Sequence, residues 1–133
     1  MTGVFLDSVG MLAVWDVADQ WHPAADVAYQ ELLARGGPLV TTEMVLLECG
    51  NAAARRPYRR RVAALRKQLI QGGLLVFPTP EEVEEAWAAY NQGEAGEAGI
   101  VDHISFRVMR RLGVTEAFTN DQHFLAAGFT TLF

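Results

Sequence analysis

Short, mostly apolar runs recur along the chain and are separated by much longer segments. A strand buried on both faces reads as a continuous apolar run, so each of these runs predicts a β-strand. The clearest example is residues 3–6, GVFL, which Asp7 and Ser8 bring to an end. The predicted strands cover residues 3–6, 38–42, 74–77, 116–119 and 129–133.

The longer segments carry the three- and four-residue spacing of amphipathic helices. Between residues 22 and 35, apolar side chains return at i, i+3, i+4 and i+7, and a pair of glycines then ends the pattern. Residues 93–99, GEAGEAG, predict a glycine-rich loop. The predicted helices cover residues 8–16, 22–35, 43–54, 57–71, 80–92, 101–112 and 121–127.

The alternation of strands and helices predicts an α/β fold, in which helices sandwich a central, mostly parallel sheet of about five short strands. The chain shows no internal repeat and no linker that would divide it. We therefore expect residues 1–133 to form a single domain.

Composition narrows the class of protein. Half of the 133 residues are hydrophobic, and the formal net charge is −5, which argues against a simple nucleic-acid-coating protein. Cys49 is the only cysteine, so it forms no internal disulfide, and we expect a small buried hydrophobe in a reducing compartment. The first residues lack the Lys or Arg of a signal peptide, and no apolar run approaches the ~20 residues of a membrane span. We expect a soluble cytoplasmic protein without membrane contact.

Two acids follow predicted strands. Asp7 comes after the first strand, and Asp121 comes after the strand over 116–119. Ligands of parallel α/β sheets bind at the carboxyl ends of strands, so both acids are candidate ligand-binding residues. The alternative is that each caps the helix that follows it. Asp102, in the first turn of the helix over 101–112, has the same two interpretations, capping or binding.

Glu48 is the only charge in MVLLECGNAAA, residues 44–54. A helix that is apolar nearly all round is usually buried, and a buried carboxylate is costly unless it is paired or bound to a metal. We therefore expect a buried Glu48 that holds a metal. The alternative is an ion pair with Arg55 or Arg56.

Four carboxylates from separate segments would repel one another if the fold gathered them without a cation. Oxygen ligands suit Mg²⁺ or Mn²⁺, and hydrolysis of phosphodiester bonds is chemistry that such ions support. His22, His103 and His123 do not have a spacing that forms a metal site.

The residues resemble a known family at this point. Asp7-Ser8 at a strand end, Glu48 in TTEMVLLECGNAA, VDHISFRVMRRLGV around Asp102 and AFTNDQHFLAAGFTTL around Asp121 are similar to the PIN domain. They are most similar to the VapC-type toxin ribonucleases of bacterial and archaeal toxin–antitoxin pairs. The resemblance implies a PIN-like α/β/α sandwich over residues 1–133.

The resemblance also implies a site. Asp7, Glu48, Asp102 and Asp121 match the acidic cluster of the family. They would bind Mg²⁺ or Mn²⁺, with Glu48 acting directly or through water and Asp121 also able to cap its helix. Ser8 and Thr119 match the polar positions that would orient ligands or water.

The activity implied is that of a metal-dependent endoribonuclease, in which one or two metal ions activate a water molecule for in-line attack on RNA. Family toxins usually form homodimers and are silenced by a protein antitoxin whose tail covers the active site. Three alternatives are a PIN nuclease of RNA processing or decay without a toxin role, a non-catalytic module whose acids bind a partner's arginines, and a phosphatase with Asp7 as nucleophile. The last is disfavoured, because such enzymes normally carry a second Asp where this chain has Val9.

Basic residues are concentrated in two segments, each of which follows a proposed metal ligand. Seven lie within residues 55–67, and three more lie at Arg107, Arg110 and Arg111. They could hold RNA phosphates or an antitoxin, and the alternatives are a solvated helix face or pairing with the acids of residues 81–85. A surface histidine without a binding role is the alternative for position 103. The candidate substrate-binding residues are Arg55, Arg56, Arg59, Arg60, His103 and Arg107.

Overall fold

The computed structural model describes residues 2–133. Its five strands form one sheet in the order β3-β2-β1-β4-β5, and every neighbouring pair is parallel. The strands are β1 (Val4–Leu6), β2 (Leu39–Thr42), β3 (Leu75–Val76), β4 (Glu116–Phe118) and β5 (Thr130–Thr131). The predicted α/β architecture, with about five short parallel strands, is confirmed.

Seven helices are seen in the described residues, at the places where the spacing of apolar residues predicts them. Their ends differ from the predicted ones by at most two residues, and those of α2 coincide with them. They are α1 (Ser8–Trp15), α2 (His22–Arg35), α3 (Glu43–Ala53), α4 (Arg59–Gln71), α5 (Pro80–Asn91), α6 (Ile100–Leu112) and α7 (Gln122–Ala126). None of them, within residues 2–133, combines the length and apolar character that crossing a membrane requires.

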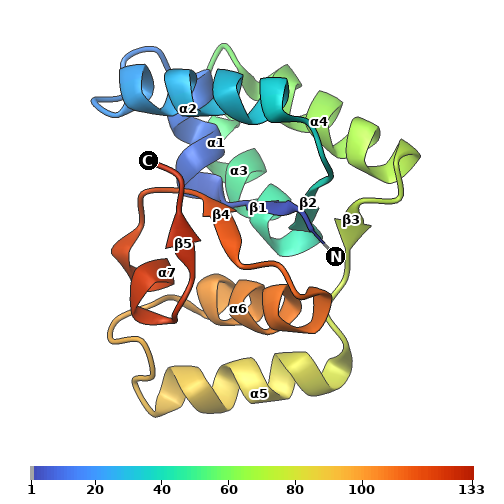
Figure 1. The fold of residues 1–133 in the computed structure, drawn as a ribbon, viewed down its shortest axis with the longest axis vertical. Helices are drawn as coiled ribbons and strands as arrows, with labels where there is room; N and C mark the ends of the chain where they lie inside the picture. The colour runs from blue at the N-terminus through green and yellow to red at the C-terminus, as the bar shows by residue number, and fades with distance from the viewer. Residues whose placement is uncertain (1) are drawn as a thin grey trace.

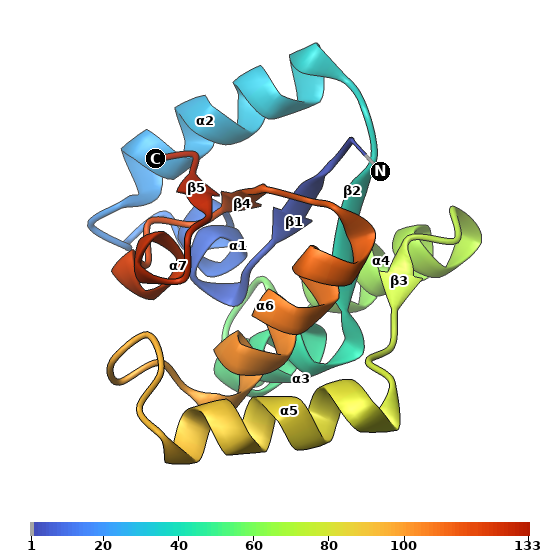
Figure 2. The ribbon, with the colours of Figure 1, turned by 60° about the horizontal axis from the view of Figure 1, so that its bottom comes forward.

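Helices cover the sheet on both sides. In Figure 1, α2 and α4 lie above the strands, whereas α6 lies below them with α5 packed on its outer side. Figure 2 shows the same arrangement from below, with α6 in front of the sheet and α5 running beneath it. The strands supply fully buried side chains such as Phe5, Leu6 and Phe118, which explains why these runs are apolar throughout.

Gly10 sets the position of α1. A Cβ atom at this residue would overlap the carbonyl oxygen of Phe118, at the end of β4. The backbone N–H of Asp7 also donates to that oxygen, at 3.4 Å. The first helix can approach β4 this closely because residue 10 has no side chain. The contact holds the start of α1 against the end of β4, and both segments carry polar residues of the site.

Candidate active site: a carboxylate cluster at the strand ends

Asp7 follows β1 and is buried, with 1% of its surface exposed. Thr119, which follows β4, donates from Oγ1 to Asp7 Oδ2 at 2.8 Å. Asp7 occupies the N-cap position of α1, but its side chain accepts no hydrogen bond from the described backbone there. The capping alternative for this residue is therefore wrong, and the carboxylate is left facing the site.

The environment of Asp7 resists its ionisation. Burial is the main cause that raises the pKa of Asp7 to about 7, and the charges of Asp102, Asp121 and Glu48 raise it further. The hydrogen bond from Thr119 acts in the opposite direction. The four predicted acids are thus close enough to act on one another, and they meet at the carboxyl edge of the sheet.

Asp102 lies in the first turn of α6 and is partly buried. Its Oδ2 accepts the backbone N–H of Gly99 at 3.2 Å, so the capping interpretation is confirmed for this residue. Burial, followed by the charge of Asp121, raises the pKa of Asp102 to about 6; the Gly99 bond and His123 lower it. Capping engages one carboxylate oxygen, and the residue still belongs to the cluster.

Asp121 caps α7, as the alternative interpretation predicted. Its Oδ1 accepts the backbone N–H of His123 at 2.9 Å, and its own N–H donates to Thr119 Oγ1 at 3.1 Å. Thr119 therefore holds two acids, Asp7 through the side chain and Asp121 through the backbone. Asp121 also lies near Asp102, since its charge raises the pKa of that carboxyl. The same side chain therefore caps a helix and belongs to the acidic cluster.

Glu48 differs from the prediction. Its side chain is exposed rather than buried, and Ser8 Oγ donates to Glu48 Oε1 at 3.0 Å. Among the described residues, neither Arg55 nor Arg56 forms an ion pair with it, so that alternative is also wrong. The apolar composition of α3 was misleading because the helix buries only part of its surface, and Leu47 is 57% exposed.

His123 is the site residue that the sequence analysis missed. One ligand atom each from Asp102, Asp121 and His123 lies within 4.8 Å of the others, a grouping that could hold a metal ion. His123 Nδ1 also lies 2.8 Å from Asp121 Oδ1. The only signal in the sequence was its place two residues after a strand-end acid, in the first turn of a short helix.

His103 is buried rather than on the surface, with 1% exposed, and its ring lies between those of Tyr90 and Phe106. Burial, then the charge of Arg107, lowers the pKa of this imidazole and favours its neutral form. A substrate contact by His103 is incompatible with this burial. The position follows from helix geometry, because residues 103 and 106 share the inner face of α6.

The arginines of α6 are engaged within the protein. Arg107 pairs with Glu94 at 3.4 Å, and Arg111 pairs with Glu82 at 2.9 Å. The second pair confirms the alternative of pairing with the acids of residues 81–85. A role of Arg107 in substrate binding stays a prediction and would require this residue to exchange Glu94 for a phosphate.

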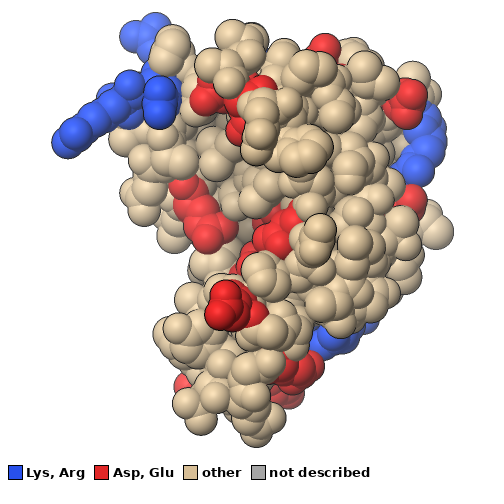
Figure 3. Space-filling model, turned by 90° about the vertical axis from the view of Figure 1, so that its left-hand side faces the viewer, with Lys and Arg blue, Asp and Glu red and all other residues tan. Residues whose placement is uncertain are grey.

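The basic residues of 55–67 form the second charged feature of the molecule. All seven are exposed, and Arg66 pairs with Glu43 at 2.9 Å. We call the four at the start of this segment the arginine cluster: Arg55, Arg56, Arg59 and Arg60. Figure 3 looks onto the side to which the strand ends point; acidic side chains gather in and around a hollow there, and basic side chains project at its upper left.

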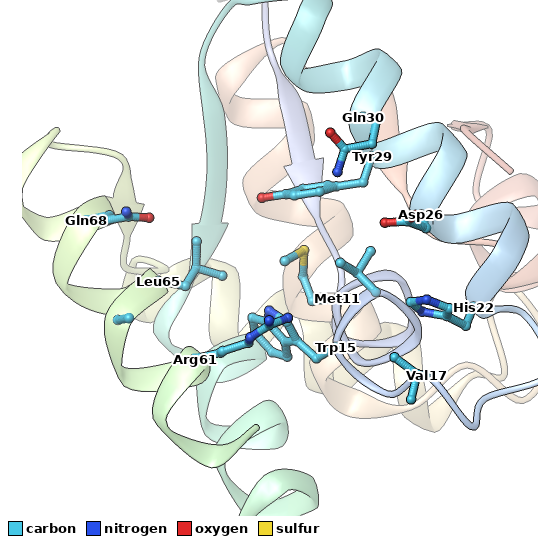
Figure 4. A pocket seen from close by; sticks show the side chains of 12 residues that line it. Met11, Trp15, Val17, His22, Asp26, Tyr29, Gln30, Arg61, Leu65 and Gln68 are labelled. Atoms are coloured by element: carbon cyan, nitrogen blue, oxygen red, sulfur yellow. The ribbon is translucent and has the colours of Figure 1, made fainter. Parts of the chain in front are cut away.

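A second concave surface lies between α1, α2 and α4 (Figure 4). It has a volume of about 490 Å³ and an apolar floor that includes Met11, Trp15 and Leu65. Asp26 and Arg61 lie on opposite walls. We call this surface the α2–α4 groove. Its lining contains none of the four acids of the cluster.

A parallel sheet with helices on both sides and carboxylates gathered at its carboxyl edge defines an α/β protein whose acidic site is built from strand ends. The chain belongs to the PIN-domain family, whose sequence profile matches residues 5–129. The resemblance seen in the sequence is confirmed.

Two relatives extend this result. The curated protein 23S rRNA-specific endonuclease VapC20 of Mycobacterium tuberculosis (strains CDC 1551 / Oshkosh and ATCC 25618 / H37Rv) is 32% identical over 128 residues, which cover 95% of each chain. The crystal structure of VapC20, described as a sarcin–ricin loop cleaving toxin, matches 96% of each chain with a TM-score of 0.76 and 28% identity. FitAcB from Neisseria gonorrhoeae shares the fold, with a TM-score of 0.64 at 14% identity, over 100% of this chain and 97% of its own.

Proposed function

We propose that this PIN-domain protein is a metal-dependent endoribonuclease and the toxin of a toxin–antitoxin pair. The observation that carries the proposal is the buried carboxylate of Asp7, whose pKa is raised to about 7 mainly by burial and further by the charges of three neighbouring carboxylates. A protein maintains such a repulsive arrangement where a bound cation offsets it. The similarity to VapC20, an endonuclease specific for 23S rRNA, supports RNA as the substrate.

The donor set fits Mg²⁺ or Mn²⁺. Carboxylate oxygens come from four separate elements, and burial raises the pKa of Asp7 and Asp102. Hard divalent ions prefer such oxygen ligands. When bound, the metal would supply Lewis-acid activation of a water molecule and would stabilise charge on the phosphate.

The residues of the chain would then bind and orient. Asp7 and Asp102 are the proposed principal ligands, with Asp121 as a further ligand held in place by its capping bond. The Thr119 hydroxyl fixes Asp7 Oδ2 and leaves Oδ1 for the metal. Ser8 orients Glu48, whose exposed carboxylate suits contact through a water molecule.

The arginine cluster is the proposed phosphate-binding surface. Its side chains are exposed, as binding to a polyanion requires. Concentrating them in one segment allows a protein of net charge −5 to attract RNA locally through counterion release. By analogy with VapC20, a stem-loop of 23S rRNA is the first substrate to examine.

A protein antitoxin is the proposed partner, and a homodimer the proposed form in the cytoplasm. The α2–α4 groove offers the antitoxin an apolar floor with one charge of each sign on its walls. Its volume of about 490 Å³ accommodates several side chains of a partner. An antitoxin bound in this groove would be anchored there while its tail covers the acidic cluster.

The test uses antitoxin-free protein and a 23S rRNA fragment that contains the sarcin–ricin loop. Cleavage is compared with Mg²⁺ or Mn²⁺, with EDTA, and in Asp7→Asn. Asp26→Asn is the matched control, because it makes the same change in the groove, outside the cluster. Cleavage that needs both the metal and Asp7, and survives Asp26→Asn, supports the proposal. Cleavage that persists in EDTA and in Asp7→Asn contradicts it.

A further inference from the structure

We propose that His123 is a metal ligand that gives the acidic cluster a preference for Mn²⁺ over Mg²⁺. The inference rests on the metal dependence proposed above and adds a residue and a selectivity to it. It starts from one grouping, in which ligand atoms of Asp102, Asp121 and His123 lie within 4.8 Å of one another. Three donors at this separation can converge on a single ion.

The fold holds the imidazole in place. His123 is in the first turn of α7, where Asp121 Oδ1 accepts its backbone N–H at 2.9 Å. The same oxygen lies 2.8 Å from His123 Nδ1, so the ring is turned toward the cluster. Because the cap uses the backbone of residue 123, any side chain at this position can preserve it. The imidazole is therefore not needed for the cap.

The surroundings of the ring are those of a ligand. His123 is partly buried, at the boundary between the cluster and solvent. A histidine that ligates a metal commonly has a carboxylate neighbour that fixes the orientation of its ring. Asp121 is such a neighbour.

The expected selectivity follows from the chemistry of the donors. Mg²⁺ favours oxygen ligands and retains much of its water, so an imidazole adds little to its binding. Mn²⁺ also favours oxygen ligands, but as the first member of the Irving–Williams series it accepts an imidazole nitrogen more readily than Mg²⁺ does. A site with carboxylates and one imidazole should therefore gain affinity for Mn²⁺ while its affinity for Mg²⁺ stays the same.

A purely electrostatic role for His123 makes the opposite prediction. An imidazole that only pairs with Asp121 competes with any cation for the same carboxylates. Removing it would then strengthen the binding of Mg²⁺ and Mn²⁺ alike. The two roles differ in the sign of the effect as well as in its selectivity.

The experiment is calorimetric titration of antitoxin-free protein with Mn²⁺ and with Mg²⁺ at pH 8. Wild type is compared with His123→Ala and His123→Gln, and the control is Gln122→Ala, a neighbouring exposed residue of α7. Both His123 variants should bind Mn²⁺ on the order of 10-fold more weakly, with Mg²⁺ affinity within about two-fold of wild type. Pulsed electron paramagnetic resonance of bound Mn²⁺ should show nitrogen coupling in wild type that both variants lose.

Equal changes for the two ions, tighter binding, or no nitrogen coupling in wild type would overturn the assignment. Asp7→Asn separates this failure from a failure of the proposed function. If wild type binds metal and Asp7→Asn does not, an unaffected His123→Ala refutes only the role of His123. If wild type binds neither ion, the metal dependence itself is refuted, and the role of His123 with it.

Discussion

Replacing Asp7 with Asn should stabilise the metal-free protein at neutral pH, although Asp7 is a proposed metal ligand. Folding raises the pKa of this carboxyl from 3.8 to about 7, mainly through burial. The folded state therefore holds a proton that the unfolded state has already lost, and stability falls as the pH rises between these values. The full cost is about 4 kcal/mol above pH 7, since one pKa unit corresponds to about 1.4 kcal/mol.

Asn removes this cost and little else. Its amide oxygen can still accept the hydrogen bond from Thr119, which now meets Asp7 Oδ2 at 2.8 Å. Relaxation of the folded state reduces the effect of a buried charge. We therefore expect the free energy of unfolding of Asp7→Asn to exceed that of wild type by about 2–4 kcal/mol at pH 8. At pH 4, where Asp7 is protonated in the folded protein, we expect the two free energies of unfolding to differ by less than about 1 kcal/mol.

Urea unfolding followed by circular dichroism in EDTA, at pH 4 and pH 8, measures both values. Asp26→Asn, which makes the same change in the α2–α4 groove, is the control. Mn²⁺ at about 1,000 times its Kd should reverse the order, because it stabilises wild type by about 4.1 kcal/mol and Asp7→Asn binds it poorly. A gain that is equal at the two pH values, or a loss at pH 8, would refute the reasoning.

Three further changes probe other parts of the structure. Thr119→Val removes the hydroxyl that donates to Asp7 and should weaken Mn²⁺ binding, measured by calorimetry, on the order of 10-fold. Thr119→Ser keeps the hydroxyl and should bind Mn²⁺ about as tightly as wild type. Equal affinities of the Val and Ser variants would contradict this role. Gly10→Ala brings a methyl group against the backbone at Phe118 and should destabilise the protein by about 3 kcal/mol in urea unfolding, and an unchanged midpoint would show that α1 can move. Arg56→Glu should weaken RNA binding and flatten its salt dependence without changing Mn²⁺ affinity, and a parallel loss of metal binding would argue for a structural role instead.

The sequence predicted the gathering of the acids because parallel strands end at the same edge of a sheet. Asp7 and Asp121 follow two strands that pair directly, β1 and β4, so their proximity needed no knowledge of side chains. The same reasoning could not give the dual role of Thr119, which depends on where one hydroxyl points. The direction of that hydroxyl is set by side-chain packing and cannot be deduced from the hydrophobic pattern of the sequence.

The errors have a common physical origin. Apolar composition does not say which face of a helix is covered, so Glu48 was expected inside although α3 leaves Leu47 exposed. His103 was grouped with neighbouring arginines, whereas its spacing from Phe106 puts it on the inner face of α6. His123 carried no repeated spacing, because one of its two partners, Asp102, lies in another helix, α6.

The bond between Thr119 and Asp7 joins residues 112 positions apart in the chain. The site therefore cannot assemble on a ribosome until the polypeptide has emerged to beyond residue 121, because the first strand-end acid has to wait for the strand that completes its surroundings. The acidic cluster would in this way remain incomplete while the chain is being synthesised. Translation that stops early would release fragments that lack the complete site.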